Sequence, residues 1–364
     1  MNQDKLKAWL CLKNAPGMGP KMAQRLLEAY PDPCKFVGVP EHAVYFSDLI
    51  PDKAKSYLRI AEPLPSLIQI IKLMETYQIS FTCLTDADYP EDLAVLFSPP
   101  LILYYRGGLH EALNSKRLAV VGTRKPSSYG REMTAKLLKP VCENGVTIIS
   151  GLAMGIDTVA HQTAVENGTK TIAVLASGVE SIYPLFNKPL SQQIINNGAL
   201  ISEYEPGSKM EKWNFPARNR LISALGDAVF ITEGQMTSGA LLTGKFALEQ
   251  GKDILALPGN VNHQNAQGPN YMIKTGACLV TCPEDILERL GIEDKPTEQL
   301  EIFPELSVEE GAVLKRLQEE SREISFDELL LLTGHNFGRL SVILLNLELK
   351  GLVAKSGNGA YITK

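Results

Sequence analysis

The sequence predicts an α/β protein whose core is a doubly wound sheet of parallel strands. Between residues 117 and 290, short apolar runs alternate with helical patterns, such as 155–167 and 238–250, at the spacing of βαβ units. Right-handed crossovers between such strands place helices on both faces of one sheet. The expected strands are 118–121, 146–149, 171–176, 199–202, 228–232, 253–257 and 277–281.

Two of these runs end in glycine-rich loops. Gly122-Thr123-Arg124 follows the first run, and Ser150-Gly151 follows the second. The carboxyl ends of parallel strands meet at one edge, where open α/β sheets bind ligands. Glycines let backbone N–H groups approach a phosphate, the following helix adds the positive end of its dipole, and Arg124 adds a cation. We therefore expect an anion-binding cradle here.

Length and charge narrow the class of protein. A chain of 364 residues is expected to form two or three domains, and a net charge of −5 excludes a broadly basic surface. The six cysteines form no C-x-x-C pair, which favours reduced core thiols over a zinc site or a disulfide framework. No signal-peptide pattern or membrane-spanning run is seen, so we expect a cytoplasmic protein without membrane contact.

The N-terminal residues 1–62 carry helical periodicity around a glycine turn. Gly17 and Gly19 lie between two helical patterns, and Lys21 follows two residues later, as in a helix-hairpin-helix (SAM-like) unit. Such a turn can hold a nucleic-acid phosphate, which makes these three residues a possible secondary DNA contact. A tight helix connection without a ligand explains the pattern equally well.

The core is expected to span residues 63–291. Its first part contains two short strand candidates, 81–84 and 101–105, separated by turn-forming residues. We expect them to extend the main sheet at its edge.

A polar linker at 292–304 leads to a small unit at 305–364. Helices are expected at 308–317, 325–332 and 336–350, followed by a hairpin of 352–355 and 360–363 around Gly357-Asn358-Gly359, which is the winged-helix order. Residues 301–364 carry seven Lys/Arg and ten Asp/Glu, a net of −3. This balance favours contact with a protein over contact with DNA.

Further donor-rich segments follow the later strands. Asn187-Lys188 begins a helix after 171–176, and Ser238-Gly239 caps a helix after 228–232. Arg218, Asn219 and Arg220 lie in a proline-initiated helix; because the two arginines are two positions apart, at most one is expected to face the ligand. The glycine spacing fits neither G-x-G-x-x-G nor a Walker loop, so no dinucleotide, nucleoside triphosphate or other cofactor is expected.

Catalytic and metal-binding interpretations find less support. Asp157 and His161, at i and i+4, could be an acid–base pair, but a buried hydrogen-bonded pair joining helix to sheet is favoured. The other histidines are isolated, so no metal site is expected. An enzyme acting on a nucleoside monophosphate, such as a phosphoribohydrolase, is the alternative function; it would need a catalytic carboxylate, with Glu203 or Glu233 as candidates.

The order of these segments resembles that of the DNA-processing protein A (DprA/Smf) family. The resemblance covers nearly the whole core and rests on Val121-Gly122-Thr123-Arg124, 150–161, the segment from Tyr183-Pro184 to Asn187, Ser202-Glu203, Phe215-Pro216 with Arg218-Asn219-Arg220, Ser238-Gly239 and Pro258-Gly259. One departure is Ile231-Thr232-Glu233-Gly234, where Glu-Ala is expected after the strand, which puts any role of Glu233 in doubt.

The resemblance implies a non-enzymatic binder of single-stranded DNA with an extended Rossmann fold. It further implies a homodimer that protects incoming DNA during natural transformation and recombination and loads the RecA recombinase onto it. Carried over to this chain, it places Arg124 in the DNA pocket and makes Lys188 a second phosphate contact. Tyr183, Phe186 and Phe215 could stack on bases, although core packing is the more common role of such residues. The apolar segments 271–273 and 278–280 are a plausible dimer interface or simply the last helix and strand of the core.

Overall fold

The computed structural model describes residues 2–61, 67–292, 306–320, 323–350, 352–356 and 360–363. By its packing the chain forms two compact units, Met1–Glu293 and Asp294–Lys364. Each unit encloses an apolar core of its own. The predicted linker 292–304 and the predicted boundary at 62/63 fall almost entirely outside the described residues.

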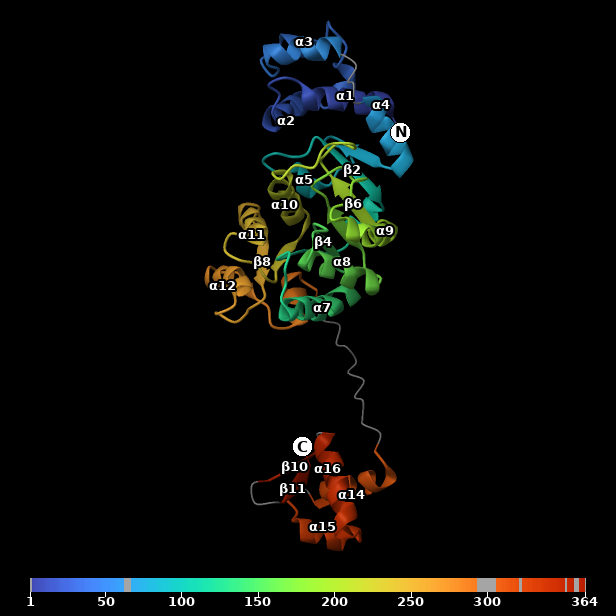
Figure 1. Ribbon diagram of the computed structural model, residues 1–364, viewed down its shortest axis with the longest axis vertical. Helices are drawn as coiled ribbons and strands as arrows, with labels where there is room; N and C mark the ends of the chain where they lie inside the picture. The colour runs from blue at the N-terminus through green and yellow to red at the C-terminus, as the bar shows by residue number, and fades with distance from the viewer. Residues whose placement is uncertain are drawn as a thin grey trace. The chain divides into compact units, whose positions relative to one another are not determined.

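A nine-stranded sheet organises the first unit (Figure 1). Strands β3 to β9 are parallel, and β2 and β1 add antiparallel partners beyond β6. The order across the sheet is β1 (Ser80–Cys83), β2 (Ile102–Gly107), β6 (Gly198–Ser202), β5 (Thr171–Val174), β4 (Thr147–Ser150), β3 (Arg117–Val121), β7 (Ala228–Ile231), β8 (Asp253–Ala256) and β9 (Cys278–Leu279). The chain runs outward from β3 in both directions, so the point between β3 and β7 is the topological switch point where such sheets bind ligands.

Helices cover both faces of this sheet because the strand residues are apolar on both sides. On β3, Leu118 and Val120 face one helical layer, whereas Ala119 and Val121 face the other. The first layer contains α7 (Ser128–Glu143), α8 (Ile156–Glu166), α9 (Lys188–Asn197) and α13 (Pro283–Arg289). The second contains α5 (Glu91–Ala94), α6 (Leu109–Leu113), α10 (Asn214–Leu225), α11 (Gly239–Glu249) and α12 (Gln267–Lys274).

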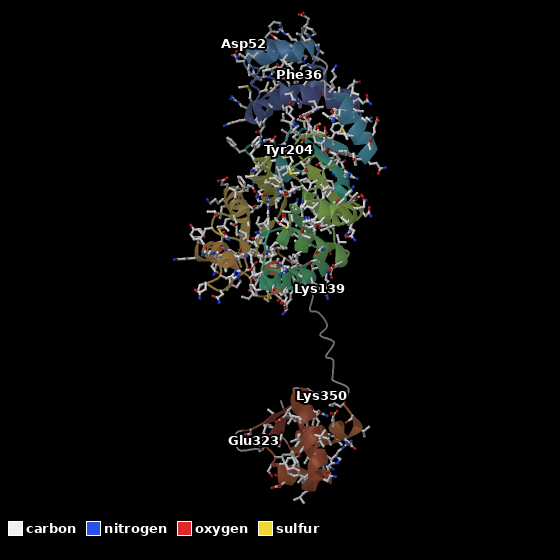
Figure 2. The ribbon with its side chains drawn as sticks, in the orientation of Figure 1. Phe36, Asp52, Lys139, Tyr204, Glu323 and Lys350 are labelled. Carbon is white, nitrogen blue, oxygen red and sulfur yellow. The ribbon has the colours of Figure 1, made fainter. Side chains whose placement is uncertain are left out.

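The N-terminal helices pack on the β1–β2 end of the sheet. They are α1 (Gln3–Asn14), α2 (Pro20–Ala29), α3 (Asp52–Ile60) and α4 (Leu67–Tyr77), with short 3₁₀ turns at Pro33–Lys35 and Ala43–Phe46. Trp9 and Phe36 share one buried cluster with Ile102 and Tyr104 of β2. Figure 2 shows Phe36 within these helices and Tyr204 near their border with the core. Ion pairs of Lys5 with Asp86 and of Lys13 with Glu205 reinforce the junction.

The second unit has the predicted winged-helix order. Helices α14 (Val308–Glu320), α15 (Phe326–Thr333) and α16 (Phe337–Leu349) enclose an apolar cluster with the hairpin of β10 (Val353–Lys355) and β11 (Tyr361–Thr363). The predicted turn Gly357-Asn358-Gly359 lies outside the described residues.

The predicted strands and helices are confirmed, with two differences of detail. The last strand is only two residues long instead of five, because β9 pairs with β8 at Cys278 and Leu279 alone. The strand predicted at 101–105 extends to Gly107 and runs antiparallel to β6. Within the described residues, no helix combines the length and apolarity needed to cross a membrane.

Removing the Phe230 side chain tests the central packing. Phe230 is fully buried on β7, so Phe230→Ala is expected to lower the free energy of unfolding of the first unit by about 3–5 kcal/mol. Both tryptophans, Trp9 and Trp213, lie in this unit, so urea unfolding followed by tryptophan fluorescence reports on it alone. The exposed ring of Phe97 provides the control; an equal loss in Phe97→Ala would contradict this account.

Candidate functional site

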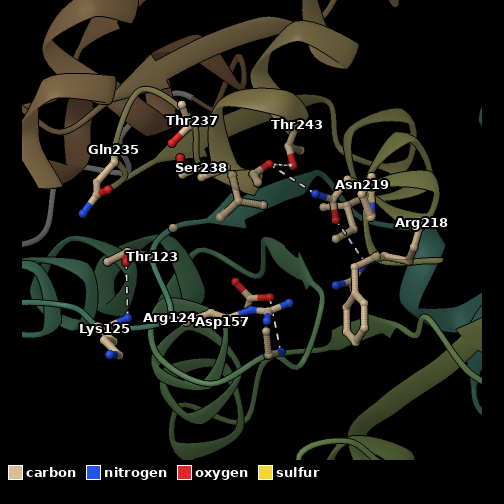
Figure 3. Close-up of a pocket in the computed structure, with 18 of the residues that line it drawn as sticks. Thr123, Arg124, Lys125, Asp157, Arg218, Asn219, Gln235, Thr237, Ser238 and Thr243 are labelled. Atoms are coloured by element: carbon tan, nitrogen blue, oxygen red, sulfur yellow. Dashed lines mark hydrogen bonds between the residues drawn. The ribbon is translucent and has the colours of Figure 1, made fainter. Parts of the chain in front are cut away.

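A cleft of about 940 Å³ opens at the carboxyl edge of the sheet, at the switch point between β3 and β7. Its walls are the loop after β3, the loop after β7 and the first turns of α10 and α11. In Figure 3, Thr123, Arg124 and Lys125 lie on one side of the opening, and Gln235, Thr237 and Ser238 lie on the other. Two of these walls follow the buried strands β3 and β7 directly, which anchors the cleft to the sheet.

Close backbone contacts fix the loop after β3. The Thr123 N–H donates to the Glu233 carbonyl at 2.7 Å, and the Thr123 carbonyl accepts from the Ile156 N–H at 3.2 Å. Gly155 adopts a φ of 93°, and a Cβ there would lie 2.4 Å from the Thr123 carbonyl oxygen. Glycine is therefore required at this position for the loops after β3 and β4 to meet.

Arg124 and Lys125 leave this loop as exposed cations. Among the described residues, no carboxylate forms an ion pair with either side chain. The Arg124 guanidinium instead lies 5.0 Å from the centre of the Phe215 ring. Phe215 in turn contacts Tyr183 edge-on, with ring centres 6.1 Å apart, and Tyr183 is 53% exposed. Arg124 and two aromatic rings thus lie together at the mouth of the cleft, which Lys125 also lines.

Arg218 lies at the floor of the cleft and is almost fully buried. Its guanidinium donates to the Gly151 carbonyl at 2.7 Å, to the Val174 carbonyl, and through Nε to Asn219 Oδ1 at 3.1 Å. Burial lowers the pKa of Arg218 to about 10, despite the opposing effect of Asp157, so the side chain stays charged at neutral pH. Arg218 therefore joins α10 to the ends of β4 and β5.

Asp157 and His161 do not form the hydrogen-bonded pair predicted from their spacing. Asp157 accepts from the Gly151 and Ala153 N–H groups, and burial raises its pKa. The Thr171 hydroxyl donates to the Ile148 carbonyl, so the His161 Nδ1–H must donate to that hydroxyl, at 2.7 Å. Each side chain thus joins α8 to the sheet separately. The structural role of Asp157 and His161 was predicted, but their hydrogen-bond partners were not.

The start of α11 forms the opposite wall. Ser238 caps the helix by accepting from the Leu241 N–H, and Asn219 donates to the Gly239 carbonyl at 3.2 Å. Thr237 and Gln235 are exposed beside them. This wall presents hydroxyl and amide groups at a helix N-terminus without a carboxylate in its first turn.

The structure brings seven of the predicted site residues to the cleft, namely Gly122, Thr123, Arg124, Arg218, Asn219, Ser238 and Gly239. As expected for residues two apart, only one of the two arginines faces it. Arg220 points away and pairs with Glu203, behind α10.

The other predicted core residues lie outside the cleft, and three of them have structural roles. Ser150 is fully buried and donates to the Val120 carbonyl, while Gly151 is buried against Arg218. Asn187 is buried and donates to the Leu152 carbonyl and the Thr158 hydroxyl, so it supports the loop after β4. Lys188 is exposed at the start of α9 but does not line the cleft.

The N-terminal turn has the predicted local geometry. Gly17 has a φ of 79°, and Gly19 immediately precedes α2. The Lys21 ammonium lies 4.9 Å from the centre of the exposed Phe97 ring. Whether this turn contacts DNA stays a prediction.

Sequence reasoning missed Lys125, Lys212, Gln235 and Asn265, all of which line the cleft. Lys125 directly follows Arg124, which was a usable signal, whereas Lys212 lies in an irregular loop. With these included, four cations (Arg124, Lys125, Lys212 and Arg218) and two carboxylates (Asp157 and Glu211) line the cleft, a net of +2. An acidic chain therefore carries a locally positive site.

Neither carboxylate proposed for an enzymatic alternative lines this cleft. Glu203 is paired with Arg220, and burial raises its pKa. Glu233 is buried and accepts from the Ser127 hydroxyl at 2.5 Å and the Ser127 N–H at 2.8 Å. In the part of the chain that the structure describes, no cluster of three His, Cys, Asp or Glu side chains could hold a metal ion.

Comparison with protein families gives two matches. Residues 80–291 match the family described as DNA recombination-mediator protein A, and residues 296–359 match the DprA winged helix domain. The chain is 42% identical over 208 residues to DNA processing protein DprA of Streptococcus pneumoniae, covering 57% of this chain and 73% of the relative. It is 35% identical over 226 residues to DNA processing protein DprA of Bacillus subtilis, covering 62% and 76%.

Comparison with solved structures also matches DNA processing protein A. The crystal structure of DNA processing protein A from Streptococcus pneumoniae aligns with a TM-score of 0.67 at 32% identity, covering 79% of this chain and 98% of that one. A structure of the Helicobacter pylori protein, which addresses its single-stranded DNA binding mode, aligns with a TM-score of 0.54 at 30% identity, covering 59% and 96%.

Buried His161 predicts a pH-dependent stability. Burial and the nearby Arg218 charge lower its pKa to about 3, below its value near 6.5 in the unfolded chain. Between these values the unfolded state binds the extra proton, so the free energy of unfolding falls as pH falls, by about 1.4 kcal/mol per pH unit.

Comparison with His161→Asn isolates this effect, because Asp157, with its raised pKa, acts in the opposite direction. Asparagine keeps a donor near the Thr171 hydroxyl and does not titrate. Urea unfolding at pH 5 to 6.5 should show the steeper loss in the unsubstituted protein. Equal slopes would mean that His161 does not titrate as inferred.

Proposed function

The chain belongs to the DNA recombination-mediator protein A family, and from this premise we propose that it binds single-stranded DNA, without sequence preference, in the cleft between β3 and β7. The observation that carries the proposal is the shared mouth of the cleft. There Arg124, which pairs with no carboxylate among the described residues, lies over the Phe215 ring, and Phe215 contacts Tyr183. Lys125 lines the same cleft.

This chemistry suits a single strand. Cations that follow the backbone bind phosphates whatever the sequence, and each base can stack on an aromatic face, for about 1–3 kcal/mol per base. The hydroxyl and amide groups of Thr237, Ser238 and Asn219 add neutral donors at a helix N-terminus. We further propose the exposed Lys188, at the start of α9, as a phosphate contact, following the family resemblance.

We propose that binding, not catalysis, is the function of this site. Glu203 and Glu233 are held by partners within the chain, so neither is positioned as an acid or base in the cleft. Of the two carboxylates that do line the cleft, Asp157 accepts backbone hydrogen bonds at its floor, and Glu211 lies in the loop before α10. The arrangement therefore supports a protein that holds DNA without cleaving it.

Its wider role follows from the family. We propose that the protein protects incoming single strands in the cytoplasm during natural transformation and recombination, and that it loads the RecA recombinase as a homodimer. The exposed Tyr271 and Leu279, on α12 and the edge strand β9, support a dimer surface at that end of the sheet. A monomer mass in light scattering at micromolar concentration would reject the dimer.

For the winged-helix unit we propose a role in protein contact. In a winged helix that reads DNA, the third helix supplies cations. Here Arg339 pairs with Glu309, and Lys350 pairs with Glu310.

The salt dependence of binding tests the cleft. Arg124→Ala combined with Lys125→Ala is expected to weaken oligothymidylate binding by about tenfold or more. The double substitution should also reduce the slope of log affinity against log salt by about 1.4, or about 0.7 for each phosphate that is no longer neutralised. Fluorescence anisotropy at several salt concentrations measures both quantities.

Lys139→Ala serves as the matched control, because this exposed lysine lies near the end of α7, away from the cleft (Figure 2). It should leave affinity and slope unchanged. Binding that ignores salt, or a double variant that binds like the unsubstituted protein, would refute the proposal.

Deleting the winged-helix unit tests its role. A chain ending at Ile292 is expected to bind oligothymidylate within about twofold of the full chain, because the unit is acidic and Arg339, the one cation in the described residues of α16, pairs with Glu309. Mobility shifts with single and double strands measure this. A large loss of affinity on deletion would instead assign DNA contact to this unit.

A further inference from the structure

A second pocket, of about 660 Å³, opens next to the cleft and has no assigned role. We call it the Tyr129 pocket; Ser127, Tyr129, Glu233, Pro258, Asn262 and His263 line it. The loop after β3 separates the two spaces, with Lys125 on the cleft side and Ser127 on the other. Asn265 Nδ2 donates to the Lys125 carbonyl at 3.0 Å and completes the partition.

The charges of the Tyr129 pocket exclude a phosphate. Among the described residues that line it there is no lysine or arginine to bind an anion, and the one acidic side chain is Glu233. Both Glu233 oxygens accept from Ser127, and among the described residues no cluster of three His, Cys, Asp or Glu side chains is available here to hold a metal ion. A neutral ligand remains.

The walls suit a planar, neutral ligand with donors and acceptors at its edge. The Tyr129 hydroxyl donates to the Pro258 carbonyl at 2.8 Å, which holds the ring in place while the residue stays 45% exposed. Asn262 and His263 are exposed beside it and offer amide and imidazole groups. An aromatic face with neutral polar groups is the chemistry that receives a nucleobase.

The pocket is also rigid before any ligand arrives. Asn270 accepts from the Gly259 N–H at 3.2 Å and donates to the Gly259 carbonyl at 2.9 Å. The Gly234 N–H donates to the Asn265 carbonyl at 2.7 Å. On the opposite side, a Cβ at Gly130 would lie 2.3 Å from the Glu233 carboxylate, so α7 packs directly on it. A wall that is already ordered loses little entropy on binding.

We infer that the Tyr129 pocket holds a nucleobase of the same DNA strand, one whose phosphate is bound by the cations of the cleft mouth. This inference rests on the proposed function, because Lys125 marks the point where a strand leaves the cleft. It adds a stacking position beyond Phe215 and Tyr183, on the far side of the Lys125–Asn265 partition. The protein would then bind the backbone of the strand in the cleft and one of its bases in the Tyr129 pocket.

Tyr129→Ala tests the inference. Its affinity for oligothymidylate should fall about tenfold, within the range for one stacked base, while the salt slope is retained because the same cations still neutralise the phosphates. Tyr129→Phe keeps the ring and should rescue most of the affinity. Tyr77→Ala, which removes a comparably exposed tyrosine on α4, is the matched control and should have no effect.

A fluorescent base gives the second readout. A single 2-aminopurine, moved along the oligothymidylate, should be quenched at one additional position in the unsubstituted protein, and this quenching should disappear in Tyr129→Ala. Asn262→Ala and His263→Ala, both surface substitutions that should not affect folding, should weaken quenching at the same position. Tryptophan-monitored unfolding confirms that the variants are folded.

Unchanged affinity and unchanged quenching in Tyr129→Ala, with normal binding by the unsubstituted protein, would overturn the Tyr129 pocket and leave the proposed function standing. Absence of salt-dependent binding by the unsubstituted protein would instead overturn the proposed function. Binding of free thymidine is the last test. If thymidine binds in a way that requires Tyr129, and the oligonucleotide does not displace it, the Tyr129 pocket binds a free nucleoside. The assignment of the pocket to a base of the DNA strand would then be wrong.

Discussion

The cleft depends on a cation that hardly meets solvent. Arg218 donates to carbonyls at the ends of β4 and β5 and to Asn219 on its own helix, so one guanidinium holds three parts of the cleft floor together. Backbone carbonyls cannot be left unpaired in the interior without a cost of about 1–3 kcal/mol each. The buried charge is in turn compensated by nearby Asp157. The exposed cations are available to bind a ligand because Arg218 holds the cleft floor in place.

This division of labour explains how an acidic chain can attract a polyanion. Most acidic side chains near the site are committed to partners inside the protein, Glu203 to Arg220 and Glu233 to Ser127. The cations at the cleft mouth have no such partners among the described residues. What a strand of DNA would meet is therefore set by local pairing and not by the overall charge of −5.

The sequence was sufficient for the order of the core strands along the chain and for the winged-helix unit, because each core strand is a short apolar run bounded by turn-forming or polar residues. It also located the edge of the sheet where the cleft opens, and it predicted that a single arginine of the 218/220 pair faces that cleft. The sequence did not show that Ser150 and Asn187 form hydrogen bonds inside the protein, whereas Ser238 lines the cleft. All three are polar residues beside strand ends, and only packing distinguishes them. Lys212 could not be predicted as a cleft residue because it lies in an irregular loop, where the sequence has no periodic pattern.

The close approach of Gly151 to Arg218 has an evolutionary consequence. A Cβ at position 151 would lie 2.2 Å from the guanidinium, so any larger residue there displaces the arginine. Gly130 and Glu233 are related in the same way, at 2.3 Å. Each glycine therefore packs against one specific side chain that is distant in the sequence. A substitution of the glycine is expected to be tolerated only if that side chain is substituted as well. Among homologous chains, these two pairs should be inherited as units.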